Sequence, residues 1–220
     1  MIIIRIICLY IFWIIIKHHP KLLKYSDNTQ FNFYRSLMCL YFTLYSLENS
    51  LNNIVDGYKN PFSFTNLQIK DITRWFVAYI SFDLLKMLYD KDTRIDLYIH
   101  HIWCLGSVLL GKYYGSCSYF YNFLLINESI SIVSGIDRIS LEEKNYEESK
   151  NYKVYRKNII KYLRLPIWII TLLITLKNTH KIPTIIWWNG ILTSLIMIYL
   201  DRYWEKKCDK VIKKYIISKI

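Results

Sequence analysis

The feature that most constrains this chain is a series of long apolar blocks separated by short charged stretches. Each block holds roughly 15–22 residues, and a helix of about 20 apolar residues crosses the hydrocarbon core of a bilayer. The blocks cover residues 2–16, 33–51, 72–89, 97–114, 117–136, 162–176 and 184–204. The pattern predicts an all-α fold, a polytopic transmembrane helical bundle of six to seven spans.

The first block, 2–16, decides between six spans and seven. It is short for a span and contains Arg5, and no small-residue cleavage site of the kind that ends a signal peptide follows it. We predict a retained first helix, which either crosses the membrane or lies in its interface. We therefore divide the chain into an N-terminal membrane helix and connector at 1–32, a transmembrane domain at 33–205 and a basic cytosolic tail at 206–220.

The net charge of +12 would suggest nucleic-acid binding in a soluble protein. Here the basic residues stand mainly between and after the apolar blocks, where Lys and Arg mark the cytosolic side of membrane helices. This placement favours a cytosolic C-terminus and no nucleic-acid partner. The charged stretch 141–157 is predicted to be a solvated cytosolic connector.

Ionisable residues inside apolar spans are costly, so each is expected to have a partner or a chemical role. Asp96, His100 and Cys104 are four residues apart and share one helix face, and His101 lies about 100° around the helix from His100. We expect Asp96 to hydrogen-bond one nitrogen of His100 and to leave the other as a base or nucleophile. Glu128, in the next block, is expected to face the histidines and form a proton-transfer pair with them.

Three less specific interpretations stay open. The two histidines stand near a helix start and would also be satisfied at the membrane interface, and Glu128 would also serve as a hydrogen-bond link between helices. A metal site built from His100, His101, Asp96 and Glu128 agrees with common ligand types, although one adjacent His pair is its only spacing signal. The chain has no P-loop, GxGxxG, GxSxG or CxxC pattern, so no cofactor is predicted.

Three segments, in order, resemble the TLC domain, a membrane-protein family that includes the ceramide synthases. Residues 92–101, Asp-Thr-Arg-Ile-Asp-Leu-Tyr-Ile-His-His, are similar to the charged loop and adjacent His pair of that branch. Residues 124–129 resemble the following helix, in which an acidic residue stands in an apolar run. Residues 164–168 resemble the start of a later helix of the family.

The resemblance implies a helical bundle that encloses a lipid-accessible cavity, usually in the endoplasmic reticulum. It also implies that His100 and His101 are required for acyl transfer from acyl-CoA to a sphingoid base; in that hypothesis Glu128 and Asp96 set their protonation. The chain departs from the ceramide synthases at Ser131, where that branch has a second acid. We therefore expect membrane lipid as the partner and a role in lipid metabolism or membrane lipid composition, through lipid binding or sensing. N-acyl transfer with acyl-CoA and a sphingoid base is the alternative.

Overall fold

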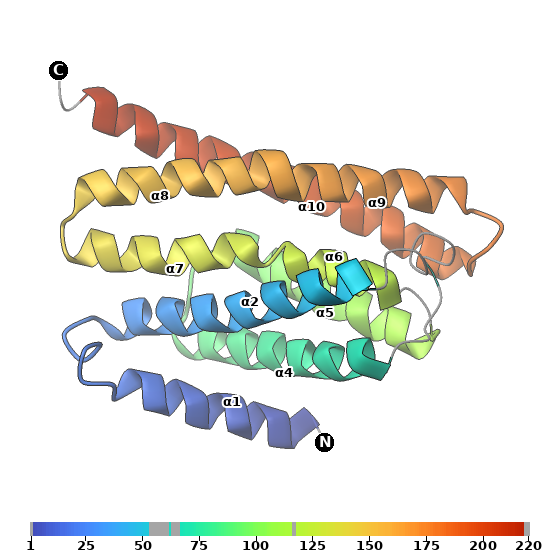
Figure 1. Ribbon diagram of the computed structural model, residues 1–220, viewed down its shortest axis with the longest axis horizontal. Helices are drawn as coiled ribbons and strands as arrows, with labels where there is room; N and C mark the ends of the chain where they lie inside the picture. The colour runs from blue at the N-terminus through green and yellow to red at the C-terminus, as the bar shows by residue number, and fades with distance from the viewer. Residues whose placement is uncertain (1, 53–61, 63–66, 116–117, 218–220) are drawn as a thin grey trace.

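The computed structural model describes residues 2–52, 62, 67–115 and 118–217. Over these residues the fold is all-α and contains no strand, which confirms the all-α part of the prediction. The helices form an elongated bundle (Figure 1). They are α1 Ile2–Lys17, α2 Asp27–Asn52, α4 Leu67–Tyr89, α5 Ile95–Tyr113, α6 Ser118–Ile126, α7 Ser129–Glu142, α8 Tyr146–Ile159, the π-helical turn η1 Ile160–Arg164, α9 Leu165–Lys177 and α10 Thr184–Ile217.

Two helical segments of the described chain are long and apolar enough to cross a membrane. They are Tyr146–Lys177, with a mean hydropathy of 1.8, and Thr184–Tyr215, with a mean hydropathy of 1.3. The first consists of α8, η1 and α9 in direct succession, and the second lies within α10. The full number of six to seven spans stays a prediction. Helix α10 runs through Ile217, so the basic segment that begins at 206 is helical as far as it is described.

The rod formed by α8 and α9 contains one irregular turn, η1. There the Leu165 N–H donates to the carbonyl of Ile160, five residues earlier. Pro166 follows, and it lacks an N–H and would clash with the carbonyl of Tyr162 in a regular α-helix. The wider turn accommodates the proline, so the rod continues without a break.

The charged stretch 141–157 differs from its prediction. Most of it is helical, because α7 ends at Glu142 and α8 begins at Tyr146. Asn145 caps α8 by accepting a hydrogen bond from the Glu148 N–H, and α8 carries acidic residues in its first turn and basic residues in its last. These charges match the helix dipole and stabilise the helix. The stretch is therefore not a loop over its whole length, and its position in the cytosol stays a prediction.

The apolar block 117–136 also differs from its prediction, since it forms two helices, α6 and α7, that are separated at Asn127 and Glu128. Cys117 lies outside the described residues. The guanidinium of Arg164 donates to the backbone carbonyl of Asn127 at this break. It thereby satisfies an acceptor that a continuous helix would have paired internally. The break places Glu128 between the two helices.

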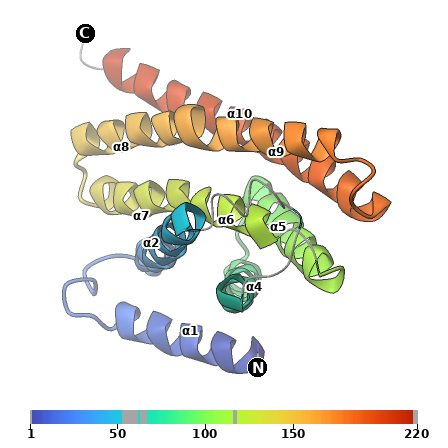
Figure 2. The ribbon, with the colours of Figure 1, turned by 45° about the vertical axis from the view of Figure 1, so that its right-hand side comes forward.

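Helix α2 packs along α6 and α7, α1 along α4, and α10 along α8 and α9 (Figures 1 and 2). One contact between α7 and α2 is close enough to require glycine. A Cβ atom on Gly135 would overlap the Ser36 hydroxyl and the Asn32 carbonyl. Ser36 Oγ also lies 3.1 Å from the carbonyl of Ile132, to which it donates, so the two helices are hydrogen-bonded at this point.

Candidate active site

A cavity of about 710 Å³ lies at the end of the bundle where α5 begins and α7 ends. Both histidines of the predicted site, His100 and His101, line it. Seven cationic side chains line it as well: Arg35, Arg94, Arg138, Lys153, Arg156, Lys207 and Lys214. Two imidazoles and an excess of positive charge therefore share one space.

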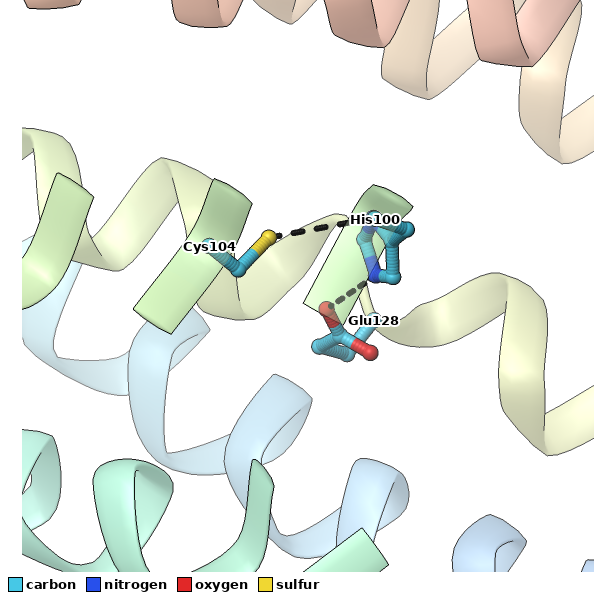
Figure 3. Close-up of side chains that lie close together, drawn as sticks. All are labelled: His100, Cys104 and Glu128. Atoms are coloured by element: carbon cyan, nitrogen blue, oxygen red, sulfur yellow. Dashed lines mark hydrogen bonds and ion pairs between the residues drawn. The ribbon is translucent and has the colours of Figure 1, made fainter. Parts of the chain in front are cut away.

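His100 and Glu128, which the sequence predicts to meet, do lie together. His100 Nε2 is 3.4 Å from Glu128 Oε1, and both side chains are buried (Figure 3). The other ring nitrogen, Nδ1, lies 3.7 Å from Cys104 Sγ and 3.4 Å from Met197 Sδ. The carboxylate thus stands at one side of the imidazole and two sulfur atoms at the other.

His101 has a different acidic partner, Asp83 of α4. The distance between His101 Nε2 and Asp83 Oδ2 is 2.9 Å, an ion-pair distance without the angle of a regular hydrogen bond. Arg35 of α2 binds the same carboxylate, with Nε 2.9 and 3.0 Å from its two oxygens. His101 Nδ1 is buried and has no hydrogen-bond partner in the described part of the chain. Asp83 therefore stands at one nitrogen of the ring, and the other nitrogen is unpaired among the described residues.

Asp83 and Arg35 are not among the residues that the sequence predicts for this site. Both are ionisable residues that fold into the bundle interior, where an unpaired charge is strongly unfavourable. That cost is the signal that would have identified them, since each needs an opposite charge nearby. Which charge each of them meets depends on the packing of α2, α4 and α5, and the spacing along one helix does not contain that information.

Asp96 does not bond His100, which corrects the predicted contact. Its Oδ2 accepts a hydrogen bond of 2.7 Å from Trp204 Nε1 and lies 3.4 Å from Lys207 Nζ, both on α10. Asp96 sits in the first turn of α5, where its short side chain meets these two donors. It lines the cavity but has no contact with either imidazole among its described partners.

Arg164 fixes the position of the helix break next to Glu128. Its side chain is fully buried, and its Nε donates to Asp201 Oδ1 at 2.8 Å. The same guanidinium binds the Asn127 carbonyl, so one residue joins η1, α10 and the α6–α7 break. A buried arginine with several acceptors holds its neighbours in a defined geometry.

Arg156 is a partly buried cation of the cavity without an ion pair among the described residues; Arg138 and Lys214 lack one as well, but both are exposed to solvent. Arg156 makes no ion pair or hydrogen bond with the described residues, and its Nε is buried without a partner. By contrast, Arg94 binds Asp92, Lys153 binds Asp137, and Lys207 contacts Asp96. A guanidinium that is largely removed from water without a carboxylate is unfavourable unless a ligand supplies negative charge.

The metal set that the sequence left open, His100, His101, Asp96 and Glu128, does not converge, because Asp96 and His101 have other partners. Another group lies closer together: His100, Cys104 and Glu128 are all buried and have donor atoms within 4.8 Å of one another, with Cys104 at Nδ1 of the ring and Glu128 at Nε2 (Figure 3). From the sequence, Cys104 is predicted only to share a helix face with His100.

Comparisons with known proteins leave the family open. The chain matches no family model, and no curated protein or solved structure is significantly similar to it.

Proposed function

We propose that this chain is a multi-pass membrane protein of lipid metabolism, which binds an anionic lipid or acyl donor in the cavity beside His100 and His101. The observation that carries the proposal is Arg156, a cation without a counter-ion in a cavity that also holds two imidazoles. A phosphate group of a lipid head or of acyl-CoA would neutralise it. Location in the endoplasmic reticulum rests on the resemblance to the TLC domain.

Support for several spans comes from the distribution of polar and apolar side chains. Large aliphatic residues are exposed along the outside, for example Ile3, Ile7, Ile11 and Ile15 in α1 and Leu173 and Leu176 in α9. The interior instead contains Asp83, Glu128, Arg164 and Asp201, none of them more than 3% exposed. Water-soluble proteins rarely have extensive apolar surfaces of this kind around a charged interior. Helices that face lipid have this distribution, because ionisable groups turn inward.

The orientation follows from the cavity. Its cationic lining lies at the end of the bundle that contains the C-terminal part of α10, and basic residues mark the cytosolic side of membrane proteins. We therefore propose a cytosolic C-terminus and a cavity that opens to the cytosol. A reporter fused after Ile220 should be cytosolic, and glycosylation sites introduced between α9 and α10 should be modified in the lumen. A lumenal C-terminal reporter would contradict this orientation.

A second candidate function, N-acyl transfer, is favoured by the geometry of His101. Its Nδ1 is buried and unpartnered, and the ring lines the cavity while Asp83 stands at Nε2. In this position His101 is suited to accept the proton of an amine as the nitrogen attacks the carbonyl of an acyl thioester. The new C–N bond forms, the C–S bond breaks, and the leaving thiolate takes the proton from the imidazolium. Arg35 and Asp83 act as positioning residues for the ring.

Both candidates can be tested in cells that lack endogenous ceramide synthase. The full-length chain is expressed with a labelled sphingoid base and acyl-CoA, and ceramide and phospholipid composition are measured. N-acyl transfer predicts labelled ceramide that is lost in His101→Ala and retained in His180→Ala, because His180 is exposed at the far turn before α10. Lipid binding without catalysis predicts no ceramide, a changed phospholipid acyl composition, and loss of that change in Arg156→Gln. Unchanged lipids in both measurements would contradict the proposal.

A further inference from the structure

Sulfur atoms and an imidazole nitrogen converge at one buried point between α5 and α10. His100 Nδ1 lies 3.4 Å from Met197 Sδ and 3.7 Å from Cys104 Sγ. The three residues are at most 5% exposed. His100 and Cys104 are four residues apart and share a helix face, and Met197 comes from the facing helix α10.

These separations are those of ligand atoms around one metal ion. For metal–nitrogen bonds of about 2.0 Å and metal–sulfur bonds of about 2.3 Å, tetrahedral or trigonal angles place the two atoms roughly 3.5–3.7 Å apart. The separation of 3.7 Å between His100 Nδ1 and Cys104 Sγ falls within this range, and that of 3.4 Å between Nδ1 and Met197 Sδ lies just below it.

The donors select the kind of ion. Thiolate and thioether sulfur favour soft ions such as copper(I), and imidazole also suits copper. One thiolate and one monovalent ion sum to zero charge, which suits a buried site of low dielectric. A divalent zinc ion would need Glu128 as a further anionic ligand, but Glu128 Oε1 lies at Nε2, whereas the sulfur atoms lie at Nδ1.

Glu128 has a defined role in such a site. By accepting a hydrogen bond from a protonated Nε2, it would hold the His100 tautomer in which Nδ1 is free to bind metal, the common arrangement of a carboxylate behind a metal-binding histidine. His100 also lines the cavity, which provides a path for the ion to reach the site.

We propose that His100 Nδ1, Cys104 Sγ and Met197 Sδ form a copper(I) site that links α5 to α10, with Glu128 orienting the histidine. The site goes beyond lipid binding or acyl transfer and does not depend on either. It assigns the two imidazoles different roles, since His100 binds the ion and His101 faces the ligand in the cavity.

The test uses the full chain, purified in detergent under anaerobic, reducing conditions. Copper(I) is titrated against a chromogenic chelator, with zinc(II) as the comparison ion, and X-ray absorption reports the atoms bound. We expect one equivalent of copper(I), with sulfur scatterers at about 2.2–2.3 Å. Affinity should fall at least tenfold in Cys104→Ser and in Met197→Leu, which preserves volume. It should be unchanged in Cys208→Ser, which removes a buried thiol elsewhere on α10.

Thermal unfolding of the same samples separates metal binding from misfolding. Copper(I) should raise the unfolding temperature of the wild type and Cys208→Ser but not that of Cys104→Ser. A wild-type protein that binds no copper(I), or a Cys104→Ser variant that binds it as tightly as the wild type, would overturn the site. The readout needs no lipid turnover, so this result is independent of the lipid assays.

Discussion

His101 and Asp83 lie against each other between α5 and α4, with Nε2 and Oδ2 2.9 Å apart. Arg35 of α2 binds the same carboxylate through three short contacts, so three helices share one buried ionic group. The negative charge of Asp83 is the central element, because without it the guanidinium and the imidazole would face each other with no anion between them. This relationship couples the stability of the bundle to the orientation of a cavity residue.

The first prediction concerns the stability that depends on this carboxylate. Asp83→Ala should lower the free energy of unfolding by about 3–5 kcal/mol, because it leaves Arg35 buried without a counter-ion. Asp90→Ala is the matched control. Asp90 pairs with Lys86 but is 39% exposed, so its loss should cost less than about 1 kcal/mol. Thermal unfolding in detergent measures both, and equal losses would contradict the central role of Asp83.

The second prediction concerns the close contact of α7 with α2. Gly135→Ala should destabilise the protein, because the added methyl group overlaps the Asn32 carbonyl, which belongs to backbone and cannot move aside cheaply. A loss of about 1–3 kcal/mol is expected from overpacking. Gly106→Ala is the control, since a Cβ there meets no atom within 4 Å and alanine is the better helix former. If Gly135→Ala were as stable as Gly106→Ala, the helices would not approach as closely as described.

The third prediction concerns pH and the loop between α4 and α5, outside the helices. The Arg94 side chain binds Asp92 and holds the pKa of that carboxyl below its usual value of 3.8. A carboxyl with a lowered pKa in the folded state adds stability that is complete above its unfolded pKa and disappears as the pH falls through the folded pKa. The stability difference between wild type and Asp92→Asn should therefore be constant at neutral pH, begin to shrink as the pH approaches about 4, and vanish only below the folded pKa. Unfolding temperatures across this range measure it, and a difference that grew in acid would refute the assignment.

The fourth prediction follows from the missing counter-ion of Arg156. Without ligand, Arg156→Gln should be more stable than wild type by about 1 kcal/mol, or about 2–4 °C in unfolding temperature, because a poorly solvated charge is removed. Anionic phospholipid or acyl-CoA should raise the unfolding temperature of wild type and not of Arg156→Gln. Arg202→Gln is the control, since Arg202 is exposed and pairs with Glu205. A variant that still responds to the anionic ligand would show that Arg156 does not bind it.

The helical character and the approximate positions of the helices could be predicted from sequence, because long apolar blocks have few structural alternatives. The meeting of His100 with Glu128 could also be predicted, since two ionisable groups in neighbouring spans must find partners. Asp96 was misassigned because spacing along one helix says which residues share a face but not which donors the facing helix presents. Trp204 Nε1 is such a donor, about a hundred residues later in the chain.

The break at Asn127 was unpredictable for a related reason. The apolar run from 118 to 136 contains no proline and no charged pair that would interrupt a helix. The interruption is stabilised from outside by Arg164, which belongs to another helix and replaces a lost backbone hydrogen bond with one from its guanidinium. Helix propensity along the sequence does not reflect such tertiary contacts. The division of this run into α6 and α7 is therefore evident only from the packed structure.

The last prediction tests this Arg164 contact by a double-mutant cycle. Arg164→Met should cost about 3–5 kcal/mol, because it leaves Asp201 buried without its cation. Adding Asp201→Leu should recover much of that loss, since both charges are then gone. The recovery should be incomplete by about 1–3 kcal/mol, because the Asn127 carbonyl still lacks its donor. The partly exposed pair of Lys157 and Asp209 is the control and should show a coupling below about 1 kcal/mol. Additive losses at Arg164 and Asp201 would mean that the two charges do not stabilise each other, and the break beside Glu128 would then need another explanation.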